Sequence, residues 1–327
     1  MVETSVLPKL TLGFKVLTVT LLLVGLFSLV TIGKEAPNTL KIGFLPAEDE
    51  LPLFVGLQRG DFARAGVDLQ LITFASAIER DTAFRAGQLD GIVTDLVAVG
   101  LFGKGKMPVK MSSITLGAKP SEGRFALLAG PKSGIKGVPD LKDVPVAISN
   151  NSIIEFVTYQ LLISGGLKDN EIKTLEIPKV PVRLEMLING QVAAATLPDP
   201  FAALAEARGA KVIASDTDAT VNLSPIVYVF TTQALEKKAE TLQRFYATYS
   251  QIVQDINADS ESFRNVMLEY CRIPKGIEEI YPVPAFPLPT VPTESEWDLV
   301  MDWMTRKGIL KKPLPYAQYV TTTYVTK

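Results

Sequence analysis

The alternation of strand-like and helix-like segments constrains this fold more than any other feature of the sequence. Short runs of aliphatic and β-branched residues are separated by segments with the spacing of amphipathic helices. Strands that alternate with helices in this way are typical of a parallel sheet flanked by helices. We expect strands at residues 40–45, 67–74, 91–94, 109–115, 124–129, 144–149, 174–177, 193–196, 212–215 and 226–231, with only helices after residue 235.

An internal repeat indicates two lobes of similar construction. Residues 80–89 and 183–192 each begin with an arginine, place two apolar residues three and four positions later, and end in Gly-Gln and a short strand. Capping-box patterns open helices at Ser76 and Ser152, because a glutamate follows each serine three residues later. Asp199 is expected to be the N-cap of a further helix, with Pro200 in its first position.

The N-terminal segment is expected to lie outside this α/β pattern. Residues 16–32 are nearly all apolar and carry no charge, and Lys9 and Lys15 precede them. Their length lies between the apolar region of a signal peptide, about 7–15 residues, and a membrane-spanning helix of about 17–25. No small-x-small cleavage site and no cysteine for lipid attachment follows, which favours an uncleaved membrane anchor over a cleaved signal peptide. A buried core helix is the third interpretation. Either of the first two places the body extracytoplasmically, in the periplasm or on the outer face of the cytoplasmic membrane.

Composition excludes several classes of site. The chain has 33 Lys and Arg against 35 Asp and Glu, a net charge of −2, which argues against a nucleic-acid partner. It contains no histidine, so histidine-based catalysis and the commonest metal ligand are excluded. Its one cysteine, Cys271, excludes an internal disulfide and a thiolate metal cluster. We therefore expect no metal and no cofactor.

Candidate ligand-binding residues follow the predicted strands. In open parallel sheets ligands bind outside the carboxyl ends of the strands, where helix N-termini also present free N–H groups. Helix capping alone would explain Ser76, Ser152 and Asp199, whereas two consecutive amides at 150–151 exceed what one cap needs. The candidates are Glu48, Asp49, Ser76, Thr94, Asp95, Asn150, Asn151, Ser152, Leu197 and Asp199.

No catalytic constellation emerges from the remaining motifs. Residues 100–106 contain three glycines and two lysines and are interpreted as a loose turn, since they lack the Gly-Lys-Ser/Thr of a phosphate-binding loop. The proline-rich residues 282–292 are expected to form an extended connector, or alternatively a docking strip for a partner. A last amphipathic helix should begin after the capping box at 293–296.

Residues 40–57, LKIGFLPAEDELPLFVGL, with the GDF motif at 60–62 and GVDL at 66–69, resemble the opening of substrate-binding proteins of ABC transporters. The type is that of nitrate, sulfonate and taurine, which includes binders of thiamine-pyrimidine precursors. The AGQLDG motif at 86–91 and PDP at 198–200 are also similar to that group.

This resemblance implies a type II periplasmic-binding-protein fold. Two α/β lobes, each a mainly parallel sheet flanked by helices, would be joined by crossover strands near 124–128 and 227–231. The implied division is a signal or anchor segment at 1–36, a first lobe at 38–126 plus 229–327, and a second lobe at 127–228.

The function implied is that of a non-enzymatic solute-binding protein. It would capture a small organic molecule between its lobes, deliver it to ABC permease subunits, act as a monomer, and meet the membrane through its N-terminal segment. The alternative is a lyase-type enzyme, which the same fold hosts in menaquinone biosynthesis. A sensory domain that keeps the ligand site without a transporter is a third possibility.

The charge of the ligand can be anticipated from the strand ends. Four candidates are carboxylates, and the nearest arginines, Arg80 and Arg183, lie inside predicted helices. Charge-assisted hydrogen bonds of about 1.5–3 kcal/mol outweigh helix-end effects of about 0.3–1 kcal/mol. We therefore expect a neutral or amine-bearing ligand rather than nitrate or a simple sulfonate.

Overall fold

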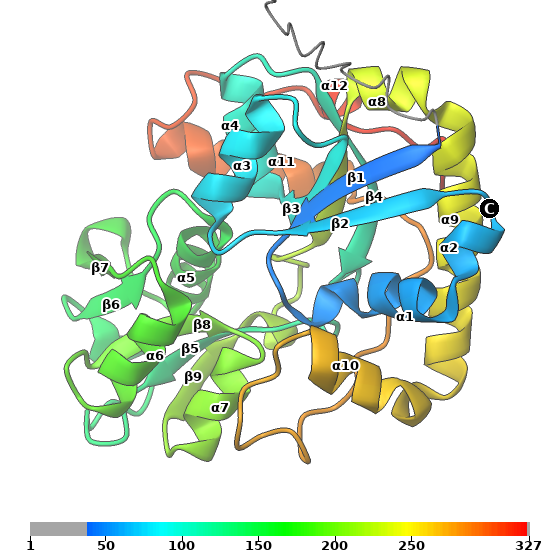
Figure 1. The fold of residues 1–327 in the computed structure, drawn as a ribbon. Helices are drawn as coiled ribbons and strands as arrows, with labels where there is room; N and C mark the ends of the chain where they lie inside the picture. Colours follow the sequence, from blue (N-terminus) through cyan, green and yellow to red (C-terminus); the bar gives the residue numbers. More distant parts are fainter. Residues whose placement is uncertain (1–37, 326–327) are drawn as a thin grey trace, which may run out of the picture. The chain divides into compact units, whose positions relative to one another are not determined.

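The computed structural model describes residues 38–325, which contain two five-stranded sheets (Figure 1). The first has the order β2 (Asp68–Thr73), β1 (Thr39–Phe44), β3 (Gly91–Asp95), β10 (Ile226–Thr231), β4 (Val109–Leu116). The second has the order β7 (Lys173–Glu176), β6 (Pro145–Ile148), β8 (Ala194–Pro198), β5 (Phe125–Ala129), β9 (Lys211–Ser215). Each sheet is mainly parallel, which confirms the predicted fold class. The exceptions are β10, antiparallel to β3 and β4, and β5, antiparallel to β8 and β9.

Helices connect the strands of both sheets. Those of the first half are α1 (Leu51–Arg59), α2 (Asp61–Arg64), α3 (Ala77–Arg85) and α4 (Leu96–Lys104), with the short 3-10 turn η1 (Glu48–Glu50) before α1. The second sheet has α5 (Ile153–Ser164), α6 (Val180–Ile188) and α7 (Phe201–Ala207), with 3-10 turns at Val138–Leu141, Asp169–Glu171 and Asp216–Asp218. After β10 come α8 (Thr232–Lys237), α9 (Ala239–Ala258), a 3-10 turn at Ser260–Phe263, α10 (Arg264–Tyr270), α11 (Glu294–Arg306) and α12 (Tyr316–Tyr319).

The predicted glycine-lysine turn at 100–106 is wrong, because most of it lies in α4. Gly100 and Gly103 are helical, and they let α4 approach its neighbours closely. A Cβ added to Gly100 would lie 2.6 Å from Met304 Sδ, and one added to Gly103 would lie 2.7 Å from the Tyr319 hydroxyl. The glycines therefore serve helix packing and not a turn.

Two adjacent segments connect the sheets, residues 117–124 between β4 and β5 and residues 216–225 between β9 and β10. Asp216 Oδ1 accepts a hydrogen bond from the Phe125 N–H at 2.8 Å, and its other oxygen accepts one from the Ser224 hydroxyl. Asn222 donates to the Gly117 carbonyl at 2.7 Å. Side chains of the 216–225 segment thus hold the 117–124 segment at both of its ends.

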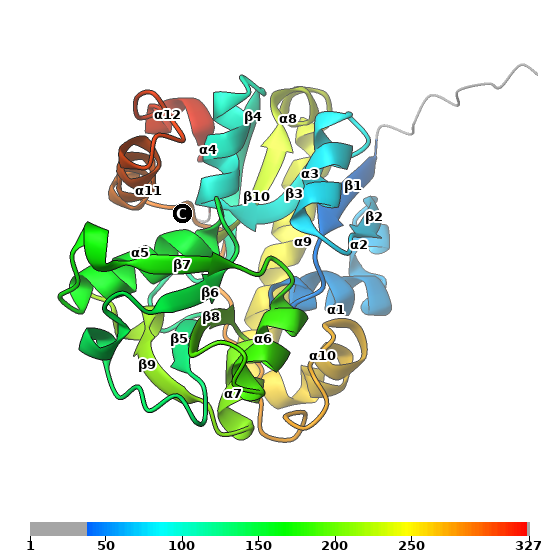
Figure 2. The same ribbon diagram turned by 90° about the vertical axis from the view of Figure 1, so that its left-hand side faces the viewer.

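Helix α11 carries contacts from the first sheet to the second (Figure 2). Trp303 of α11 packs edge-on against Phe156 of α5 with ring centroids 5.5 Å apart, and Lys307 forms an ion pair with Glu155. The capping box predicted at 293–296 is present, since the Glu296 N–H donates to Thr293 Oγ1 and Glu296 accepts from the Thr293 N–H.

The proline-rich residues 282–292 contain neither helix nor strand, as an extended connector requires. Asn257 of α9 fixes this connector through two hydrogen bonds with the backbone of Phe286, at 2.7 and 2.9 Å. The predicted N-terminal apolar helix lies outside the described residues. Among those described, no helix has the length and apolar character needed to cross a membrane.

Candidate functional site

Three consecutive carboxyl groups, Glu48, Asp49 and Glu50, are buried in η1, which begins shortly after the end of β1. Glu48 Oε1 accepts a hydrogen bond from the Tyr281 hydroxyl at 3.0 Å, whereas Oε2 is enclosed and has no partner among the described residues. Burial and the neighbouring Asp49 raise the pKa of Glu48 to about 8, so this carboxyl is largely protonated at neutral pH. Burial also raises the pKa of Asp49 and, more strongly, that of Glu50.

Tyr281 reaches this turn from a segment that the sequence analysis missed. It lies 233 residues along the chain from Glu48, and Arg264 of α10 holds it by donating to the Tyr281 carbonyl at 2.7 Å. No local pattern around residue 281 indicates such a long-range contact.

A second missed residue, Arg124, lies directly before β5. Its Nε and Nη2 contact the two carboxylate oxygens of Asp199 at 3.1 and 2.7 Å, a side-on bidentate pair. Asp199 Oδ1 also accepts from the Ala203 N–H at 3.2 Å, so it still caps the helix, although α7 begins at Phe201 with Pro200 as N-cap. The negative charge of Asp199 contributes to the raised pKa of Glu48. The Arg124–Asp199 pair is therefore close enough to the acidic turn to interact with it electrostatically.

The remaining first-sheet candidates gather around Arg80. This arginine donates to Thr94 Oγ1 at 2.9 Å and to the Val93 carbonyl at 2.7 Å, and its Nε donates to Asp81 at 2.9 Å. Asp95 is the N-cap of α4 and accepts from the Ala98 N–H at 3.0 Å, and burial raises its pKa. Ser76 is the N-cap of α3, and of the predicted capping box the structure gives the serine half, in which Ser76 Oγ accepts from the Glu79 N–H at 3.3 Å.

Second-sheet candidates meet in the turn between β6 and α5. Asn150 is exposed and donates to Glu176 at 3.0 Å. Asn151 has a left-handed backbone with φ of 53°, and its N–H donates to Glu155 at 2.6 Å. The capping box predicted at Ser152 is wrong in detail. The Ser152 hydroxyl donates to the Ser149 carbonyl at 2.6 Å instead of capping α5, and Glu155 reaches back to Asn151.

Arg183 lies against the same turn, and its position corrects the expected charge balance. Its Nη1 donates to Ser149 Oγ at 2.9 Å and to the Ile177 carbonyl at 2.7 Å. Both arginines of the internal repeat, Arg80 and Arg183, therefore reach from a helix to the carboxyl end of a sheet. The expected ligand charge assumed that no cation lies at a strand end. That assumption is wrong, because an arginine side chain is long enough to extend from a helix to the end of a strand.

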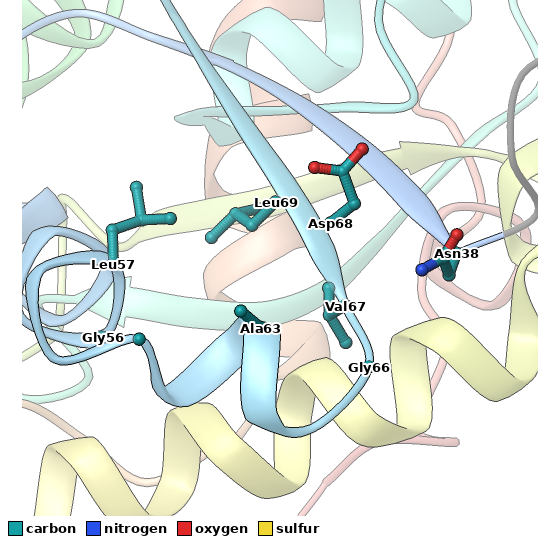
Figure 3. Close-up of a pocket in the computed structure, with 9 residues that line it drawn as sticks. Asn38, Gly56, Leu57, Ala63, Gly66, Val67, Asp68 and Leu69 are labelled. Atoms are coloured by element: carbon teal, nitrogen blue, oxygen red, sulfur yellow. The ribbon is translucent and has the colours of Figure 1, made fainter.

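Leu197, the last candidate, is fully buried in β8 within the hydrophobic core. A cavity of about 290 Å³ lies elsewhere, between α1, α2 and β2, where Leu57, Ala63 and Leu69 are among its lining residues (Figure 3). None of the ten candidates lines that cavity.

Comparison with known proteins supports the architecture. A family model described as the NMT1-like family matches residues 33–270, and no curated protein matches the chain. Among solved structures, the ligand-binding component of an ABC-type import system from Staphylococcus aureus is 15% identical with a TM-score of 0.73, covering 88% of this chain and 97% of that one.

Two further structures share the fold. The periplasmic aliphatic sulphonate binding protein SsuA from Escherichia coli is 20% identical with a TM-score of 0.72, covering 86% of this chain and 97% of that one. The desulfurization enzyme DSZB is 14% identical with a TM-score of 0.65, covering 88% of this chain and 97% of that one. These matches confirm the predicted resemblance and fold, and they include both a binding protein and an enzyme.

Proposed function

The chain belongs to the NMT1-like family, and from this premise we propose that it is an extracytoplasmic solute-binding protein. It captures a small organic molecule between two lobes and delivers it to the permease subunits of an ABC transporter. The observation that carries the proposal is the division of residues 38–325 into two sheets joined by two adjacent segments, a design suited to hinged closure. In this proposal the first lobe holds β1–β4 and β10 and the second holds β5–β9, with the boundaries in the segments 117–124 and 216–225, a few residues from the predicted boundaries at 126/127 and 228/229.

The ligand contacts come from both lobes. The first contributes the acidic turn at Glu48 and Asp49 and the strand-end residues Ser76, Thr94 and Asp95. The second contributes the turn at 150–152 and the end of β8 with Asp199. Neither set encloses a ligand alone, so the ligand binds the closed state more tightly than the open one. Binding therefore shifts the population toward the closed state.

A binding role is favoured over the enzymatic alternative by the chemistry of the candidate groups. Cys271 is buried, and burial together with the acidic turn raises the pKa of its thiol, so it has little thiolate character for nucleophilic attack. The buried carboxyl groups are held by Tyr281 and by each other, in positions that suit recognition of a polar ligand.

The transport role places the body outside the cytoplasm. The apolar residues 16–32 would act as an export signal or as an anchor to the cytoplasmic membrane. Matched structures such as the import component from Staphylococcus aureus support this placement through the shared fold.

Thermal denaturation of the full chain against a panel of amines, pyrimidines, sulfonates and nitrate tests the proposal. We expect at least one compound to raise the melting temperature in a saturable manner, by linkage of binding to folding. Exchange of Asp199 to Asn should weaken that effect about 10-fold or more, whereas the exposed Glu236→Gln should leave it unchanged. A panel in which no compound shifts the transition would contradict a solute-binding role.

A further inference from the structure

Glu155, in the first turn of α5, holds two partners that belong to different parts of the fold. Its Oε2 accepts a hydrogen bond from the Asn151 N–H at 2.6 Å, and its Oε1 forms an ion pair with Lys307, the C-cap residue of α11. The Glu155 side chain is only 11% exposed. One enclosed carboxylate therefore joins the turn at 149–152 to the end of α11.

The helix that carries Lys307 is fixed to the first sheet. It packs on α4 so closely that a Cβ added to Gly100 would lie 2.6 Å from Met304 Sδ. Helix α4 follows β3 of the first sheet, whereas α5 follows β6 of the second. The ion pair between Glu155 and Lys307 therefore links the two lobes of the proposed function at a place separate from the two connecting segments.

An aromatic contact adjoins the ion pair on its apolar side. Trp303 of α11 is 3% exposed and packs against Phe156 of α5, with ring centroids 5.5 Å apart. The Lys307 ammonium lies 5.4 Å from the centroid of the Trp303 ring, within the range of a cation–π interaction. Charges that are partly screened from water attract each other more strongly than exposed ones. Any displacement of one lobe relative to the other changes the distances among these side chains.

The other oxygen of Glu155 supports an uncommon backbone conformation in the turn. Asn151 has a φ of 53°, in the left-handed region that residues other than glycine seldom adopt. The acceptor that holds its N–H is the same carboxylate that Lys307 holds from α11. Since this turn carries the candidate ligand contacts at 150–152, the geometry of these contacts depends on a residue of the other lobe.

We infer that Glu155 is a positioning residue that couples the 149–152 turn to closure of the lobes. The inference rests on the proposed function and names the residues through which closure acts on the ligand contacts. Lys307 reaches Glu155 when the lobes are close together, and the paired carboxylate then holds Asn151 in its ligand-binding conformation. A ligand that binds this conformation favours the closed state, so by reciprocity loss of the ion pair weakens binding.

Hydrogen–deuterium exchange of the full chain without ligand measures this coupling. Lys307→Met keeps the alkyl stem beside Trp303 but removes the charge, and the Asn151 amide should then exchange about 5-fold faster or more. Lys307→Arg keeps a charged donor and should exchange as the unmodified protein does. Glu155→Gln retains an acceptor for the Asn151 N–H without the ion pair and should resemble Lys307→Met. Equal exchange at Asn151 in Lys307→Met and the unmodified protein would overturn the inference.

Binding provides the second measurement. The probe is the amine, pyrimidine, sulfonate or nitrate that raises the melting temperature of the unmodified protein most. Its affinity should fall about 5-fold or more in Lys307→Met, although Lys307 is not among the candidate ligand contacts, and should be retained in Lys307→Arg. A role in general stability alone would lower the melting temperature of Lys307→Met without changing the affinity.

The matched control is Lys142→Met, at an exposed lysine that pairs with Glu171 at 2.9 Å inside the second lobe. It should leave both the exchange at Asn151 and the affinity unchanged. A probe that binds Lys307→Met and the unmodified protein equally well refutes the coupling and leaves the proposed function intact. A panel in which no compound binds contradicts the proposed function, and the inference with it.

Discussion

At the scale of single residues, the acidic turn is the most unusual feature of the described structure. Three consecutive carboxyl groups are buried, and Glu48 has one enclosed oxygen with no partner in the described residues. A carboxyl whose pKa is raised on folding binds a proton more tightly in the folded chain than in the unfolded one. Its contribution to stability is therefore complete below its ordinary pKa of 4.5 and is lost as the pH rises through about 8.

Exchange of Glu48 to Gln is expected to flatten the dependence of stability on pH. The amide keeps an acceptor for the Tyr281 hydroxyl but does not ionise, so the penalty for a buried charge disappears. Relative to the unmodified protein, the variant should gain up to about 3–5 kcal/mol in free energy of unfolding between pH 5 and pH 8.5. Urea denaturation at several pH values measures this.

The exposed Glu236→Gln serves as the control for that series and should follow the unmodified protein. Since Asp49 and Glu50 also have raised pKa values, some pH dependence should persist in Glu48→Gln. Parallel curves for Glu48→Gln and the unmodified protein would show that this carboxyl is ionised at neutral pH.

At the scale of helices, α4 shows how packing determines which residues a helix can carry. Both Gly100 and Gly103 lie in helical backbone, where alanine is favoured by about 1 kcal/mol. Gly100 faces the flexible ends of Met301 and Met304, whereas Gly103 faces Leu314 and the ring of Tyr319. A change from glycine to alanine therefore contacts adaptable methionine side chains at position 100 and a less adaptable aromatic ring at position 103.

We expect Gly103→Ala to destabilise the protein by about 1–2 kcal/mol and Gly100→Ala to be close to neutral. Tyr319 is stacked on Trp297 with ring centroids 5.4 Å apart, so it cannot move without disturbing a second buried ring. Methionine side chains adapt at low cost. Chemical denaturation of the two variants measures the difference, and an equal effect at both positions would contradict this explanation.

Hydrophobic periodicity was sufficient to predict most of the strands and helices, because apolar spacing and capping residues are local signals. The strand predicted at 226–231 agrees with the structure to the residue. The sequence did not predict helix α4, because only close contacts with α11 and α12 explain its glycines. No local pattern reveals those contacts. The site was less accessible still, since Tyr281, Arg124 and the direction of Arg183 depend on residues far away in the chain.

At the scale of the whole described molecule, the two sheets and their paired connections are the basis for a closing motion. Asp216 and Asn222 tie the two connecting segments together, so both can bend as one hinge. Candidate contacts lie at the ends of both sheets, and the internal repeat places an arginine at each. We therefore expect the ligand to be captured by closure of the two hinged lobes.

Small-angle X-ray scattering measures whether the lobes close on a ligand. The measurement uses a chain beginning at Ala36, since residues Ala36–Lys327 form one compact unit. Scattering is recorded with and without saturating amounts of the compound that stabilises the protein most in the thermal panel. We predict a smaller radius of gyration with the compound bound, because the closed state brings the lobes together. An identical scattering profile at saturation would contradict capture by closure.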